Sequence, residues 1–297
     1  MATANPIVTA ITGYVEEHKS ELLSKSMLDG KSRRTFNLMT GVKGPTTLNI
    51  MDTDVQFGEL SCGWNEQGST EFSQRKLTPK GLEVNMAFCD KKLLNTYAQY
   101  EVKIAAGLET LPFEEKWTSQ ILKSVNEKIE SMIYFGTGEG ASFQGIVPIL
   151  SAETDTVKVN AVSGTSAYDF LKEVAKSIPV QVKDPVILVS TPLYREYMQD
   201  LVSANLFHFD PANGENEYKL PGTDIRVIAV DGLNSTASTV AIAANMDNLF
   251  YGVSADEDSD IFDLWYSKDN REFRLAIQFM AGVQVAFPAE IVLGVRG

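Results

Sequence analysis

The side chains that most often carry chemistry in proteins are scarce in this chain of 297 residues. It has only two histidines, His18 and His208. A zinc site built on several histidines needs more than two of them, and a Ser-His-Asp triad needs a histidine beside a serine and an aspartate. The sequence gives little support for either site. We interpret both histidines as exposed or hydrogen-bonded residues of the fold. The sequence therefore predicts no catalytic residue and no cofactor.

One segment does match a nucleotide-binding pattern. Residues 136–141 read Gly-Thr-Gly-Glu-Gly-Ala, the G-x-G-x-x-A form of a dinucleotide fingerprint. That fingerprint follows a strand and opens a helix, because the phosphate binds at a helix N-terminus. Here the segment follows a helical pattern, and the C-terminal end of a helix dipole is negative. We favour a loop that ends a helix.

Asp256, Asp258 and Asp260 match the acidic positions at the start of a calcium-binding loop. The sixth position is Ile261 and the twelfth is Ser267, where calcium loops have glycine and glutamate. We expect a solvated acidic turn and no metal ligand set, and leave open weak cation binding at a subunit junction.

A basic group lies near the N-terminus at Lys31, Arg33 and Arg34. These residues follow a short amphipathic pattern around Ile11 and Val15, and we expect an N-terminal arm with little core of its own. The three charges are interpreted as a solvated connector. The alternative is that they touch enclosed nucleic acid or a partner's acidic surface.

Composition describes a folded, acidic chain. Apolar residues make up 44%, and 39 Asp and Glu against 26 Lys and Arg give a formal charge of −13. This balance argues against a large basic surface for nucleic acid. The start has no signal-peptide pattern and no run of eighteen apolar residues exists, so we expect a soluble cytoplasmic chain without a membrane partner. Cys62 and Cys89 are then expected to be free thiols, with their pairing left open.

The elements that frame these residues are unusually long. Residues 271–287 alternate apolar and polar side chains as one long strand, which Pro288 breaks before a short return strand. Residues 113–135 repeat apolar side chains at i, i+4 and predict one long helix, with Trp117 in its core. Residues 46–95 predict a long hairpin that needs another surface to lie on.

The remaining sequence, about 150–262, predicts a compact α/β block. We expect a helix near residues 166–178, a buried strand at 185–190 and a helix from Pro192 capped by Thr191. Strands at 225–230 and 239–243 follow.

The order of these parts resembles the major capsid proteins of tailed bacteriophages, the Hong Kong 97-type fold. The resemblance rests on the arm, the hairpin, the long helix ending at Phe135-Gly136-Thr137-Gly138, then Gly145-Ile146, the α/β block and the long strand. The segments Asn248–Val253 and Phe279–Pro288 are similar to the C-terminal sequence pattern of that family. No single short segment is specific to the family, and the resemblance rests on the order of the parts along the chain.

The resemblance implies an α+β fold in four parts. These are an N-terminal arm (1–45), an E-loop hairpin (46–95), a peripheral domain (96–149 and 261–287) and an axial domain (150–260 and 288–297). It also implies a non-enzymatic protein that assembles as hexamers and pentamers into an icosahedral virion shell around double-stranded DNA. Assembly is expected in the host bacterial cytoplasm.

The implied partners are other copies of the chain, a portal, a separate scaffold and decoration proteins. No charged scaffolding segment precedes the arm, so we expect a separate scaffold or none, and no maturation cleavage. The candidate inter-subunit residues are Trp64, Phe72, Lys76, Lys80, Arg33 and Arg34. Some family members cross-link a lysine of the hairpin; Lys76 and Lys80 match by position only, so no bond is predicted.

Two alternatives stay open. An encapsulin-like bacterial compartment would share the fold and enclose enzymes, although no cargo pocket is recognisable. An α/β enzyme would use residues 150–262, but that segment shows no convergent polar cluster.

Overall fold

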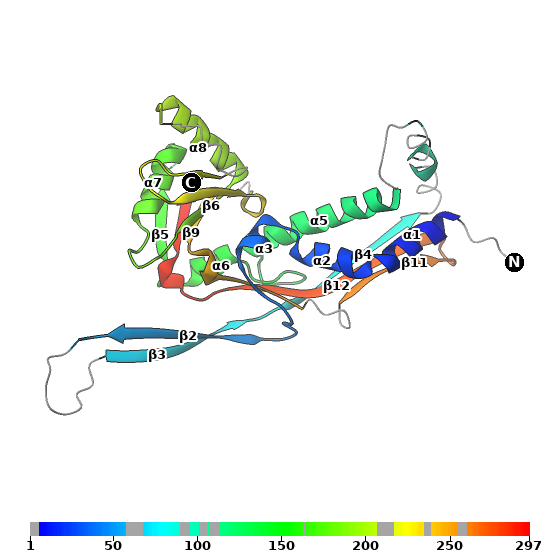
Figure 1. Cartoon of the computed structure of the whole chain (residues 1–297), viewed down its shortest axis with the longest axis horizontal. Coiled ribbons are helices and arrows are strands. Elements are labelled where there is room, and N and C mark those ends of the chain that lie inside the picture. The colour runs from blue at the N-terminus through cyan, green and yellow to red at the C-terminus, as the bar shows by residue number, and fades with distance from the viewer. Residues whose placement is uncertain are drawn as a thin grey trace.

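A computed structural model describes most of the chain. The described residues are 6–57, 68–89, 96–100, 102, 106, 113–162, 164–206, 217–234, 239–254 and 260–297. The molecule is elongated, with a mixed lobe at one end, a long helix lying along a sheet, and a hairpin projecting beneath the lobe (Figure 1). Helices and strands are mixed throughout, which confirms the α+β prediction.

The long C-terminal strand organises the first sheet. It is β12, Glu272–Val285, and has 14 residues. One edge pairs with β4 (Lys80–Cys89), and the other pairs with β11 (Ile261–Ser267) and then β10 (Leu249–Val253). The short β1 (Asn37–Met39) adds parallel to β10. A 3-10 turn at η3, Pro288–Glu290, then leads into β13 (Val292–Arg296), as the proline break predicted.

The long helix α5 spans Phe113–Phe135 and runs along this sheet (Figure 1). Its predicted stripe is buried at Ile121, Val125, Ile129 and Ile133, in one core with the sheet. Trp117 is only partly buried, and its ring meets Phe88 of β4 edge to face at 5.1 Å. The helix prediction is confirmed, because apolar side chains spaced at i, i+4 share one face.

The N-terminal residues differ from the predicted arm. They form α1 (Pro6–Glu17), α2 (Lys19–Leu28) and α3 (Lys31–Thr35). The amphipathic pattern is confirmed, but the expectation of little core is wrong, because the buried side chains of α1 and α2 join the core of α5 and β11. These side chains are Ile11, Val15, Leu22, Leu23 and Met27.

The hairpin consists of β2 (Thr46–Val55) and β3 (Gly68–Leu77), which pair antiparallel over ten rungs. The prediction that it continues to residue 95 is corrected, because β4 leaves it after Pro79 and pairs with β12. The reason lies in the alternation from Leu82 to Phe88, which needs a core to cover it. α5 covers these apolar side chains of β4 in the core of the first sheet. A two-stranded hairpin alone could not bury them.

The lobe is built on a six-stranded sheet of order β5-β13-β9-β6-β8-β7. Three helices accompany it. The new elements are α6 (Ile146–Ala152), β5 (Val157–Ala161), α7 (Ala167–Lys176), β6 (Val186–Ser190), α8 (Thr191–Ser203), β7 (Glu217–Lys219), β8 (Arg226–Val230), η1 (Asp231–Leu233), β9 (Thr239–Ala244) and η2 (Met246–Asn248).

Both faces of this sheet are covered. In β6, Ile187 and Val189 pack with α7 and α8, whereas Val186 and Leu188 face the core shared with α5. A strand buried on both faces reads as a continuous apolar run, as β6 does.

The predicted elements of the block are confirmed with two corrections. The cap of α8 is Ser190, whose Oγ accepts from the Leu193 N–H, and not Thr191. The α/β block also ends before residue 262, because β10 lies in the first sheet, whereas β11 and β13 lie where the division into 261–287 and 288–297 placed them. Neither feature is a property of local sequence, since both depend on tertiary pairing.

Candidate assembly surfaces

The two faces of the β2–β3 hairpin differ. Leu48 and Ile50 are buried at the base, on the face turned toward the body of the molecule. Met51 and Phe72 are opposite one another in the ladder and are 61% and 78% exposed. Because successive residues of a strand point to opposite faces, this pair lies on the outward face. The hairpin therefore presents an unpartnered apolar pair to solvent.

The base of the hairpin is tied to the chain's own body. Arg75 of β3 pairs with Glu153 after α6. The Gln284 side chain of β12 donates to the Lys76 carbonyl at 2.7 Å. Just beyond, Lys80 Nζ donates to the Gly138 carbonyl at 2.7 Å. The base of the hairpin is thus fixed to the body, and the ribbon then runs beneath the lobe (Figure 1).

The interface candidates from the sequence fall in different places. Phe72 and Lys76 are exposed on the hairpin, and Lys80 is partly buried at its foot. Trp64 lies outside the described residues. Met51 was missed, because only the register across the hairpin shows that it faces Phe72.

Arg33 is not part of a solvated connector, which corrects its place among the surface candidates. Its side chain is 2% exposed and caps the end of α2 by donating to the carbonyls of Ser26, Met27 and Asp29 at 3.2, 3.0 and 2.7 Å. The same guanidinium donates to Asn126 Oδ1 at 3.1 Å and lies 3.6 Å from Glu130. A buried guanidinium is compensated only by such partners, so Arg33 joins α2 and α3 to α5.

Arg34 behaves as the sequence predicted for the whole basic group. Its side chain is exposed and pairs with Asp29 at 2.6 Å. The contrast with Arg33 follows from helical spacing, because adjacent residues of α3 point in different directions. Asn126 and Glu130, the partners of Arg33, are spaced four apart and flank the apolar stripe of α5. Two polar residues at this spacing beside an apolar stripe are the signal by which they could have been found.

A small polar network surrounds Arg33. Glu130 accepts from the Ser32 N–H at 2.9 Å, and Ser32 Oγ lies 2.6 Å from the Tyr134 hydroxyl. Tyr251 donates to the Met27 carbonyl at 3.2 Å. Burial raises the pKa of Tyr251 to about 12, and burial also raises the pKa of Tyr134 far above its ordinary value. Both tyrosines are therefore neutral hydrogen-bonding groups of the interior.

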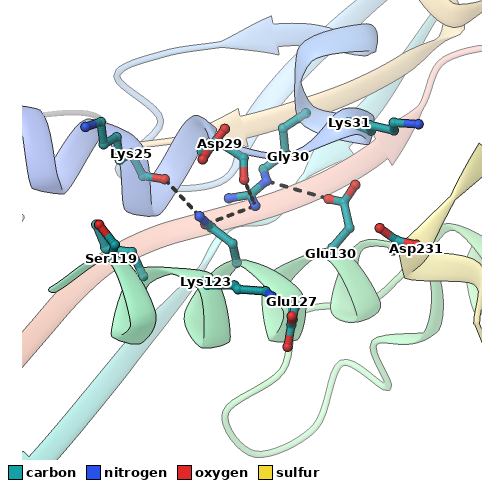
Figure 2. Close-up of a pocket in the computed structure, with 12 residues that line it drawn as sticks. Lys25, Asp29, Gly30, Lys31, Ser119, Lys123, Glu127, Glu130 and Asp231 are labelled. Carbon is teal, nitrogen blue, oxygen red and sulfur yellow. Dashed lines mark hydrogen bonds and ion pairs between the residues drawn. The ribbon is translucent and has the colours of Figure 1, made fainter. Parts of the chain in front are cut away.

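An open cavity of about 430 Å³ lies beside this network. Figure 2 shows Lys25 and Asp29 on one side of it, facing Ser119, Lys123 and Glu130 of α5. Cationic and anionic side chains alternate around the cavity, so it favours neither an anion nor a cation. Its inner wall is the Arg33–Glu130 pair, and we assign it to the packing of α2 on α5.

An apolar groove runs between the β4 edge and α5. It has a volume of about 460 Å³, and Phe88, Trp117 and Gln120 also line a neighbouring cavity of about 800 Å³. The edge of β4 opposite β12 carries no strand among the described residues. The apolar lining of the narrower part includes Leu82, Val84, Met86, Phe88, Trp117, Ile121, Val125, Ile129, Met132 and Phe279.

The segment resembling a nucleotide fingerprint is a helix-ending loop, as predicted. α5 ends at Phe135, and the loop returns to Gly145, which begins α6. A Cβ on Gly136 would lie 2.1 Å from the Phe143 carbonyl, so glycine is needed for this close crossing. The loop offers a phosphate no helix N-terminus at the fingerprint itself.

The other candidate chemical residues have ordinary surroundings. The expectation of a solvated acidic turn is wrong at Asp260, which is buried and accepts from Ser254 Oγ at 2.5 Å. Asp256 and Asp258 lie outside the described residues. His18 lies 3.4 Å from Glu21 with its ring against Tyr14, and His208 lies outside the described residues. Cys89 is exposed at the end of β4. Cys62 also lies outside the described residues.

The part of the chain that the structure describes has neither a cluster of metal-binding side chains nor a helix that could span a membrane. No group of three or more His, Cys, Asp or Glu side chains in it could hold a metal ion. No helix in the same residues is both long and apolar enough to cross a bilayer.

Comparison by sequence gives no relative: no family model and no curated protein matches the chain. Comparison by structure gives whole-chain matches. A chain of the satellite phage P4 procapsid is 10% identical with a TM-score of 0.61, covering 94% of this chain and 98% of that chain. The capsid of the native GTA particle is 10% identical with a TM-score of 0.56, covering 92% and 91%.

The capsid of Myoviridae phage XM1 is a third such match. It is 10% identical with a TM-score of 0.52 and covers 88% of this chain and 90% of that chain. The three matches confirm the resemblance to phage capsid proteins at the level of the fold. They cover between 88% and 94% of this chain, so the likeness extends over most of the fold.

Proposed function

We propose that this chain is the major capsid protein of a tailed bacteriophage, and that it forms the shell of the virion. The observation that carries the proposal is the match of nearly the whole chain to capsid chains that are themselves covered over nearly their whole length. Fold alone does not define function. The second support is the kind of surface that the chain presents, a projecting ribbon (Figure 1) with an exposed apolar pair.

We further propose the Hong Kong 97-type division of the chain. The arm (1–45), here helical and docked on α5, precedes the E-loop, whose ribbon is β2–β3. The peripheral domain contains α5 and the sheet of β12, to which β4 and β10 now belong, and the axial domain is the six-stranded lobe with β13.

Assembly would proceed through hexamers and pentamers. A ribbon whose outer face is unpartnered gains burial by lying on another copy, and a head-to-tail contact of this kind closes into rings. Phe72 and Met51 are the anchors we propose on the ribbon, because aromatic residues and methionine are enriched at protein interfaces. Portal, scaffold and decoration proteins remain proposed partners on the strength of the resemblance alone.

The shell would enclose double-stranded DNA without reading its sequence. The formal charge of −13 supports this, because a strongly basic wall would bind the packaged polyanion and resist its movement. The compartment alternative is not favoured, since the capsid matches reported above come from phages and a GTA particle.

The test is to express the chain, separate the products by size-exclusion chromatography and image them by negative-stain electron microscopy. We expect closed shells, or rings of five and six subunits, with candidate scaffold added if the chain alone forms only rings. A second arm measures whether nuclease-resistant DNA co-purifies with shells from infected cells. A protein that stays monomeric in all these conditions would overturn the capsid proposal.

A further inference from the structure

The groove between β4 and α5 has the character of a small-molecule site. It has a volume of about 460 Å³, and most of the side chains that line it are apolar. Sites for small ligands typically have volumes of roughly 300 to 1,000 Å³, a mainly apolar lining and a few polar groups that fix the orientation of the ligand. Met86 of β4 lines the groove and is 37% exposed, so the apolar wall is open to solvent. The groove can therefore take an apolar ligand from solution.

The groove is long in the direction of the helix. Phe88 meets Trp117 near one end, with ring centroids 5.1 Å apart, and Leu82 and Met132 line the groove near the other end. At the rise of an α-helix, the stretch of α5 from Trp117 to Met132 is roughly 22 Å long. An extended alkyl chain fits an apolar lining of this length better than a compact ring does.

The polar side chains of the α5 wall lie in a single row. Gln120, Ser124 and Lys128 are spaced four apart, so they share one face of the helix, and all three are exposed and line the groove. Lys128 forms no ion pair or hydrogen bond with another residue of the described part of the chain. A lysine can lay its methylene stem along an apolar surface while its ammonium stays in water. The rim therefore offers a positive charge to the head group of an amphipathic ligand.

The acidic side chain that lines the groove is already hydrogen-bonded. Glu83 Oε1 accepts from Gln278 Nε2 at 3.0 Å and from Asn85 Nδ2 at 2.5 Å. Gln278 of β12 lies directly opposite Glu83 in the ladder, and both alternate with the apolar residues that pack toward α5. The Glu83 carboxylate is therefore held on the side of the sheet away from α5 and leaves Lys128 available to an anion.

We infer that the groove between β4 and α5 binds a long-chain alkyl carboxylate, with the chain along the apolar lining and the carboxylate at Lys128. This inference goes beyond the proposed function, because a single subunit forms the whole site. A cationic amphiphile would place its charge beside a lysine, and a small polar anion would gain nothing from the apolar lining. No bond of the ligand is made or broken, so this is a binding site alone.

The chain length of the ligand gives the first test. Unassembled subunits are titrated with octanoate, decanoate and dodecanoate by isothermal titration calorimetry, each below its critical micelle concentration. Because every added methylene buries more apolar surface, Kd is expected to fall by roughly tenfold for each two methylenes, with one molecule bound per chain. Equal affinity for the three chains, or no binding of dodecanoate, would overturn the inference.

Two matched variants of α5 locate the alkyl chain. Ser124→Trp covers the groove, whereas Ser119→Trp places the same bulky side chain at an exposed position that lines the other cavity, beside α2. The affinity for dodecanoate is expected to fall by at least about tenfold in the first variant and to stay within about twofold in the second. Circular dichroism melts show that each variant is folded. The same affinity in both variants would place the ligand outside the groove.

A second matched pair locates the carboxylate. Lys128→Gln is expected to weaken dodecanoate by about twofold to fivefold, because an exposed ion pair contributes little, and to leave the affinity for dodecanol unchanged. Lys123→Gln removes an exposed lysine from the other side of the same helix and is expected to change neither ligand. Equal effects of the two substitutions on dodecanoate would contradict the assignment of Lys128.

A free fatty acid and the acyl lipids of a bilayer share this chemistry, and flotation with phosphatidylglycerol vesicles separates them. We expect subunits that bind dodecanoate and do not float with the vesicles. Subunits that float and bind no dodecanoate would overturn the inference in favour of a membrane surface. Failure of every ligand would leave the capsid proposal standing, whereas a chain that binds dodecanoate and never assembles would overturn the capsid proposal alone.

Discussion

The six-stranded lobe and the β2–β3 hairpin show opposite relations between a sheet and its surroundings. Every residue of β6 is buried, because helices cover one face of the lobe's sheet and the shared core covers the other. The hairpin has two strands, is held to the body only near its base, and exposes Met51 and Phe72 beyond it. The lobe buries its apolar side chains within one chain, whereas the hairpin exposes apolar side chains that only another molecule could cover.

The largest expected effect comes from removing the far half of the hairpin. Deleting residues 62–72 should abolish rings and shells while leaving a folded monomer, because the lobe and the long sheet bury their own cores. Size-exclusion chromatography and the thermal unfolding midpoint measure the two properties separately. Shells of normal size from the deleted chain would show that the hairpin is not an interface.

The next effect concerns stability within the chain. Arg33→Met should lower the free energy of unfolding by about 3 to 5 kcal/mol, since it leaves Glu130 charged and buried without its partner. Arg34→Met, one residue away on an exposed ion pair, should change it by less than about 1 kcal/mol. Urea unfolding of the purified chains measures both.

A second substitution isolates the cause of that loss. Arg33→Met/Glu130→Leu should recover much of the stability, because the second substitution removes the buried Glu130 carboxylate that Arg33→Met leaves without its partner. If the double variant is as unstable as Arg33→Met alone, the cost lies in the lost capping of α2 instead.

A smaller effect is expected where the lobe meets α5. A Cβ at Gly232 of η1 would lie 2.3 Å from the Glu130 carbonyl and 2.5 Å from the Tyr134 ring. Gly232→Ala should therefore cost about 1 to 3 kcal/mol through overpacking. Gly44→Ala, with open space around the new Cβ, is the control. Equal melting temperatures for both variants would mean that the joint is looser than it is described here.

The smallest effect is expected at the foot of the hairpin. Lys80→Met removes the hydrogen bond to the Gly138 carbonyl and should cost about 1 kcal/mol at most, because the group is near the surface. Stability is read by urea unfolding, and assembly by electron microscopy. A complete loss of shells with unchanged stability would instead make Lys80 part of the interface.

The long elements could be predicted from sequence because each is defined by its own periodicity. The i, i+4 stripe from Phe113 and the alternation from Phe273 to Val285 depend only on which residues face one core. The predicted end of the strand is wrong, because β12 stops at Val285 and Phe287 is exposed. The partners of a strand do not follow from its own sequence, so the transfer of β4 from the hairpin to β12 was missed. The same applies to β10, which was expected in the axial domain and lies in the sheet of β12.

The candidate surfaces followed the same rule. Phe72 could be named because an apolar residue in a predicted hairpin has no core to enter. Arg33 and Arg34 are adjacent and of the same type, and only the packing of α3 on α5 shows that one is buried and the other exposed. The groove joins residues of β4 and α5 and has no signature in either segment alone.

The comparison between lobe and hairpin is tested most directly by amide hydrogen exchange on free subunits and on assembled particles. We expect amides of β6, β8 and β9 to be protected in both states, and amides of β2 and β3 beyond the base to gain protection only in particles. Exchange from the hairpin that is equally fast in both states would contradict its role as the element that joins one copy to the next.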